Sequence, residues 1–167
     1  MQQIYNIKYI DAFYTYKEIE ITKLFVHEAY GYLTIYKDVI IITFIHKVLE
    51  RKSTSNTKKI IKGLIIPSTA LQTVNNNYRT NVLNKVILFS NIAVTWRDIV
   101  YVANTNRNDC SIMYSEGILY RIETDHIVLK NPETIRINPL PIINHPAKKP
   151  IYYIIPNSFI TDIVTIK

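Results

Sequence analysis

The strongest concentration of charge lies between His46 and Lys62. Six cationic side chains occur there against one carboxylate, so this segment carries net +5 of the chain's formal net charge of +7. The cations flank a polar stretch, residues 53–57, which is typical of a hairpin loop. They are Lys47, Arg51, Lys52, Lys58, Lys59 and Lys62. Such a loop either contacts phosphates or is simply solvated, and the sequence leaves both interpretations open.

The aromatic content points in the same direction as the charge. The chain has 20 basic against 13 acidic residues and 13 tyrosines. Tyrosine beside lysine suits base stacking next to phosphate contacts, and predicts salt-sensitive binding with little sequence selectivity. The alternative is that Tyr replaces Phe on strand faces, because the abundance of Ile, Lys, Asn and Tyr is typical of an AT-rich gene. A viral origin is one source of such a gene.

Catalytic motifs are absent from the sequence. It contains no Gly-rich phosphate loop, no Gly-x-Ser-x-Gly and no His-Glu-x-x-His. Asp125 and His126 are adjacent, and we expect their side chains on opposite faces of a strand, which argues against a catalytic dyad. The single Cys110 allows no internal disulfide and no Cys cluster for zinc. We therefore predict a non-enzymatic protein without metal or cofactor.

The elements that position these residues are predicted to be β-strands. Residues 30–45 and 82–102 are rich in β-branched and aromatic residues. Turn signals follow at 75–77, 104–109, Asn131-Pro132 and Asn138-Pro139, while Ser68 to Leu71 could start a short helical turn. The chain is expected to be mainly β and antiparallel.

A weak internal repeat divides the chain. Gly31 and Gly117 each begin an apolar strand that leads to an Asp, at Asp38 and Asp125, and an Ile-Ile-Pro follows at 65–67 and 154–156. Each Gly marks a bend where a Cβ would clash, and each Pro should end a strand. The repeat predicts two β-modules, residues 1–78 and 79–167. A single β-sandwich of about ten strands is the alternative if the repeat is accidental.

The repeat gives the basic loop a counterpart. Residues 138–150 hold four prolines with Lys148 and Lys149, at the place in the second copy that the basic loop has in the first. We expect both loops to project from the same edge of their modules and to form one positive face.

The second copy resembles the Sm-like family. The resemblance rests on residues 125–132, Asp followed by apolar residues and Asn-Pro, and on the closing segment 152–160. It covers residues 111–165 and, more faintly, residues 21–74. It implies two small open barrels of strongly bent antiparallel strands whose last two strands pair with neighbouring subunits. Three or four chains would then close a ring of six or eight modules.

The family's uridine pocket does not carry over to this sequence. Val128 and Leu129 replace the pocket Asn that follows the Asp, and Pro156 stands in the closing turn. The positions that still match the family's motif are Asp38, Asp125, Asn131, Asn157 and Ser158. They either line a pocket or serve the turns, with each Asp accepting backbone donors and Ser158 capping.

We thus expect a protein that binds RNA or single-stranded nucleic acid as a homo-oligomeric ring. No segment is apolar enough to cross a membrane as a helix, so a cytoplasmic location is expected, in a host cytoplasm if the gene is viral. The alternatives are a structural or interaction module without nucleic acid, or a β-rich nuclease or inhibitor with an unrecognised site.

Overall fold

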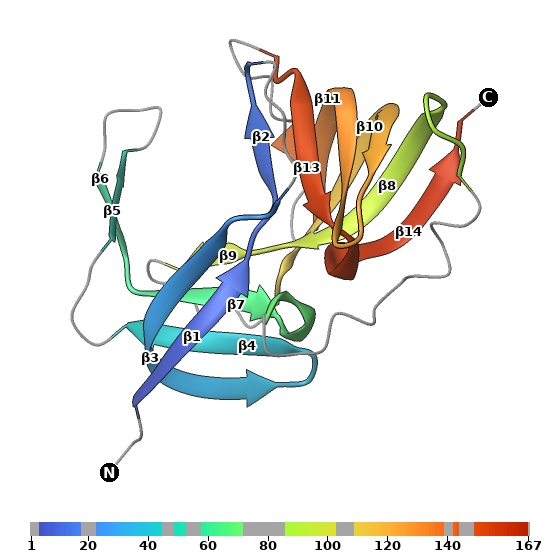
Figure 1. Ribbon diagram of the computed structural model, residues 1–167. Helices are drawn as coiled ribbons and strands as arrows, with labels where there is room; N and C mark the ends of the chain where they lie inside the picture. Colours follow the sequence, from blue (N-terminus) through green and yellow to red (C-terminus); the bar gives the residue numbers. More distant parts are fainter. Residues whose placement is uncertain are drawn as a thin grey trace.

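The computed structural model describes residues 4–17, 23–44, 49–52, 58–71, 86–102, 109–138, 142–143 and 149–166. Within these ranges the chain forms antiparallel strands and short 3-10 turns, which confirms the mainly β class. The strands make two main sheets and one separate hairpin (Figure 1).

The first sheet has five strands in the order β1, β3, β4, β7, β9. Their bounds are β1 Ile4–Ile10, β3 Val26–Tyr36, β4 Val39–Phe44, β7 Gly63–Pro67 and β9 Val100–Val102. The apolar run that starts at Tyr30 becomes a hairpin because Lys37, at φ 53°, turns the chain back. A separate hairpin, β5 (Leu49–Lys52) with β6 (Lys58–Ile61), is inserted between β4 and β7.

The second sheet has the order β14, β8, β10, β11, β13, β2. Their bounds are β2 Phe13–Thr15, β8 Asn91–Asp98, β10 Ser111–Ile122, β11 His126–Asn138, β13 Tyr152–Pro156 and β14 Ile160–Thr165, and β12 (Ile142–Ile143) also pairs with β11. In the described part of the chain, the two outermost strands of each sheet do not pair with one another. Both sheets are therefore open, and neither is a closed barrel.

The two halves exchange strands. After Ile10 the chain leaves the first sheet, and β2 pairs with β13 of the second sheet. After Asp98 the chain leaves the second sheet, and β9 pairs with β7 of the first. Each half thus covers an edge of the other with the extension of its own first strand.

The pairing registers repeat between the halves. Ile40–Ile66 in the first half corresponds to Ile127–Ile155 in the second, and Leu64–Tyr101 corresponds to Tyr153–Tyr14. Likewise Ile4–Tyr32 corresponds to Asn91–Ile118, and the isolated bridge Tyr9–Leu71 corresponds to Trp96–Ile160. In each match the residue numbers differ by 86 to 89. The weak repeat in the sequence therefore corresponds to a repeated strand geometry.

The prolines and the turns after them match in the two halves. Pro67 ends β7 and Pro156 ends β13, and each leads into one 3-10 turn, η1 (Ser68–Ala70) or η3 (Asn157–Phe159). The predicted helical turn after Pro67 is thus confirmed. The first amide of each turn donates to an aspartate backbone carbonyl at 2.9 Å, Ser68 to Asp38 and Asn157 to Asp125.

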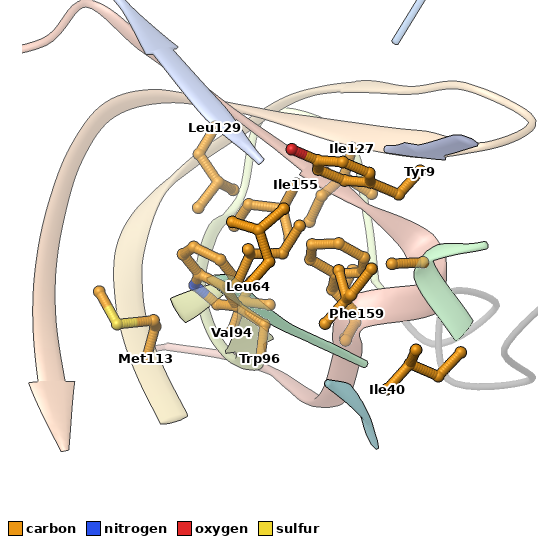
Figure 2. Close-up of a cluster of buried hydrophobic side chains, with 14 of the residues drawn as sticks. Tyr9, Ile40, Leu64, Val94, Trp96, Met113, Ile127, Leu129, Ile155 and Phe159 are labelled. Atoms are coloured by element: carbon orange, nitrogen blue, oxygen red, sulfur yellow. The ribbon is translucent and has the colours of Figure 1, made fainter. Parts of the chain in front are cut away.

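The main core is shared by both sheets. Figure 2 shows Tyr9, Ile40 and Leu64 from the first sheet packed in one cluster with Trp96 and Phe159 from the second half. Trp96 is fully buried, and its indole N–H donates to Ser115 Oγ at 3.0 Å. The two predicted modules, residues 1–78 and 79–167, therefore share one hydrophobic core.

Two sequence predictions about local structure were wrong. Asn131-Pro132 lies inside β11 rather than in a turn between strands, because Asn131 adopts φ 51° and the strand continues. The strand-rich run 82–102 is interrupted at residues 87–90, which form a turn closed by the amide of Ser90 donating to Ile87, and β8 begins at Asn91; residues 82–85 lie outside the described ranges. The turn expected at 75–77 lies outside the described residues, as does most of the one at 104–109.

Candidate nucleic-acid interface

The basic segment forms a projecting hairpin. β5 and β6 pair only with each other, and in Figure 1 they stand clear of both sheets. The hairpin is anchored at its base, where the Phe44 amide donates to the Lys62 carbonyl at 2.8 Å and the Lys62 side chain is exposed. Lys47 lies outside the described residues.

The hairpin register places cations opposite cations. Arg51 is the partner of Lys59, and Lys52 is the partner of Lys58. Like charges directly opposite in an antiparallel pair destabilise it. A polyanion placed along the hairpin would relieve this repulsion, since each phosphate can neutralise a lysine or arginine.

The second basic loop contributes less free charge than the sequence suggested. Lys148 lies outside the described residues. Lys149 is described, and its Nζ lies 2.7 Å from Glu133 Oε1 in an exposed ion pair. Lys149 precedes β13 of the second sheet, whereas the basic hairpin is inserted between β4 and β7 of the first.

The two repeated aspartates bind different partners. Asp38 forms an ion pair with Arg97 of the other half. The hydrogen bond and charge of Arg97 hold the pKa of Asp38 below its usual value. Asp125 Oδ1 lies 2.6 Å from His126 Nδ1, which corrects the expectation that these neighbours point apart. They meet because Asp125 belongs to the turn before β11, where strand alternation does not apply.

The remaining pocket candidates serve the fold in different ways. Asn157 is buried, and its Nδ2 donates to the carbonyls of Glu123 and Thr124 at 3.3 and 3.2 Å. Asn131 is exposed at its bend. Ser158 Oγ is buried and has no hydrogen bond in the described structure, so the predicted capping role is wrong.

Polar atoms without partners gather near the Asp125 turn. His126 is fully buried, and its Nε2 has no hydrogen-bond partner among the described residues, like Asn157 Oδ1. Within those residues no group of three or more His, Cys, Asp or Glu could hold a metal. The turn thus offers buried polar atoms but no metal site.

The sequence did not single out an aromatic cluster on the second sheet. The Phe89 ring lies edge-on to Tyr120 at 6.3 Å between centroids, and Tyr120 packs on Tyr152 at 5.2 Å. Lys130 Nζ lies 5.5 Å from the centre of the Tyr120 ring. These residues come from four separate segments, so no spacing in the sequence could reveal them.

Comparisons with known protein families, with curated proteins and with solved structures found no match. None of the helices in the described ranges is long and apolar enough to cross a membrane.

Proposed function

We propose that this chain binds RNA or single-stranded nucleic acid without catalysis, through the β5–β6 hairpin. The observation that carries the proposal is the register of that hairpin, which sets Arg51 opposite Lys59 and Lys52 opposite Lys58. Like charges at facing positions of an antiparallel pair repel one another, so we expect a bound polyanion to favour this hairpin. The hairpin also projects from the sheets, so a single-stranded nucleic acid can reach it.

The proposal includes assembly as an Sm-like oligomer, in which only a strand at the edge of a sheet can pair with a neighbouring chain. The resemblance implied pairing through the last two strands, but β13 already has β11 on one side and β2 on the other. β14 pairs with β8 and is the last strand of its sheet among the described residues. We therefore propose that neighbouring chains pair through β14, whose exposed residues include Val164.

Binding is tested by fluorescence anisotropy with a labelled 12-nucleotide RNA of mixed sequence at 50 to 200 mM salt. Replacing Lys52, Lys58 and Lys59 with Glu should weaken binding strongly. It should also reduce the slope of log K against log salt by about 2, since each contact to a single strand contributes about 0.7. The matched control replaces exposed lysines outside the hairpin, Lys17, Lys23 and Lys37, with Glu, because it changes the net charge equally.

Three results would contradict the proposal. Equal losses in the two triple variants would mean that only net charge matters and that the hairpin is not the site. Unchanged affinity in the hairpin variant, with the wild type bound, would also refute it. A wild-type chain that ignores RNA at 50 mM salt would favour the interaction module, and light scattering of that chain would show whether it still assembles.

A further inference from the structure

We infer that Phe89, Tyr120 and Lys130 form a stacking site for an unpaired base of a single-stranded nucleic acid, an inference that rests on the proposed function. Phe89 belongs to the turn before β8, and its side chain is 71% exposed. In Figure 1 this turn and the β5–β6 hairpin lie on opposite sides of the molecule. A short oligonucleotide should therefore reach the stacking site without touching the hairpin.

The turn holds Phe89 firmly in place. The Phe89 amide donates to the Leu119 carbonyl at 2.8 Å, and the Leu119 amide donates to the Ser90 carbonyl at 3.0 Å. Ser90 Oγ closes the turn on the Ile87 carbonyl at 2.6 Å. These bonds fix the backbone from which the Phe89 ring projects, so little backbone freedom is lost when a base stacks on the ring.

Folding alone does not account for Phe at this position. Phe89 has φ 65°, a left-handed conformation that bulky side chains rarely adopt. Its ring also stays largely in water, so burial does not compensate for the backbone strain. Strain kept at an exposed aromatic residue is typical of binding sites.

The first half provides an internal comparison, because it has the same strands without this cluster. Thr43 has the register position of Lys130, and Gly63 has that of Tyr152. Tyr120 is the extra residue of a bulge, where the register shifts between Leu119 and Arg121, and the β3–β4 pairing continues without a shift. The repeated fold therefore does not require the cluster, and bulges of this kind commonly redirect a side chain toward a site.

The chemistry of the cluster fits a nucleotide. A base can stack on the exposed Phe89 ring, while Lys130, held over Tyr120, supplies a cation for the adjoining phosphate. Ile87 and Leu88 are exposed beside Phe89 and would also suit a lipid surface. The cation and the chain's charge of +7 favour the nucleic acid.

The test places a reporter in the site. Native Trp96 is fully buried, so Phe89→Trp adds an exposed indole whose emission should be quenched by the dinucleotide ApA. The matched control is Phe25→Trp, because Phe25 is 61% exposed and packs on Phe13 at 5.1 Å between ring centroids. Its emission should not change. The same quenching in a chain that also carries the three hairpin substitutions would show that the stacking site acts independently of the hairpin.

A second variant separates binding from stability. Phe89→Asn should lower affinity for oligo(A) by about 5- to 150-fold, the usual range for losing one stacked base. It should not lower the urea midpoint, since Asn tolerates the left-handed backbone. Lys130→Met should reduce the slope of log K against log salt by about 0.7.

The outcomes distinguish the two proposals. If the hairpin substitutions abolish RNA binding and Phe89→Trp is not quenched by ApA, the stacking site is refuted and the hairpin proposal stands. If ApA quenches Phe89→Trp while the hairpin variant binds RNA normally, the stacking site stands and the hairpin proposal fails. A blue shift of Phe89→Trp with phosphatidylserine vesicles and no response to ApA would overturn the inference in favour of a membrane surface.

Discussion

Replacing Gly31 with Ala should destabilise the fold far more than replacing its counterpart, Gly117. Neither glycine has a positive φ, so Ala can adopt both backbones and the comparison isolates steric effects. At Gly31 a methyl group would lie 2.8 Å from the Thr43 carbonyl carbon and closer still to its oxygen. At Gly117 the nearest atom is the Lys130 carbonyl oxygen, at 3.0 Å.

The expected magnitudes follow from these distances. Overpacking that displaces backbone costs about 1–3 kcal/mol and sometimes more, and at Gly31 no side-chain rotation can relieve it, so we expect a loss of at least about 3 kcal/mol. At Gly117 a shift of a few tenths of an ångström suffices, and Ala stabilises by about 0.4–1 kcal/mol through the unfolded chain. The net change there should be within about 1 kcal/mol of zero.

The assay is urea unfolding followed by the fluorescence of the buried Trp96. Against a typical stability of about 5–15 kcal/mol, the difference between the variants should be plain in the midpoints, provided that the slopes agree. Gly31→Ala that unfolds at the same urea concentration as Gly117→Ala would refute the close approach of β3 to β4.

Two further predictions concern pH. Arg97 lowers the pKa of Asp38 below 3.8, so the ion pair stabilises the fold above about pH 4, and this contribution is lost as pH falls through the folded pKa. Because Asp38 is 66% exposed, Asp38→Asn should cost at most about 1 kcal/mol at pH 6 and less at pH 2, and an equal loss at both pH values would exclude the ion pair as the cause. Burial raises the pKa of Tyr153 well above 10, and the charge of Asp98 adds to this, so stability should fall above pH 10 by about 1.4 kcal/mol per pH unit as the unfolded phenol ionises. Burial likewise raises the pKa of Tyr9, so Tyr153→Phe should reduce the slope by about 1.4 kcal/mol per pH unit in urea titrations at pH 9 to 11 without removing it. Exposed Tyr36→Phe is the control, and an unchanged slope in Tyr153→Phe would rule out a contribution from Tyr153.

Much of the fold could be predicted because its signals are local. β-branched runs gave the strands, and Pro67 and Pro156 marked where two of them end, since Pro cannot donate in a ladder. The glycines showed where strands approach closely. Such features depend on a residue and its immediate neighbours, so a single sequence suffices to find them.

The strand exchange could not be predicted, because β2 and β9 are only three residues long and their partners are remote in sequence. The stacking cluster escaped for the same reason, since Phe89 and Tyr152 meet only through Tyr120. The contact of Asp125 with His126 was missed because it depends on where the turn ends and β11 begins, a boundary that composition does not fix.

The exchange of strands limits how early native strand pairs can form during synthesis of the chain. β2 is made near the start of synthesis, but its partner β13 follows about 140 residues later. At a synthesis rate of about 5–20 residues per second, roughly 7–30 s pass before β13 is available to pair with the backbone of β2. The native pairing of β2 can thus form only after β13 has been synthesised. Until then, β2 in the nascent chain is available to pair with non-native strands.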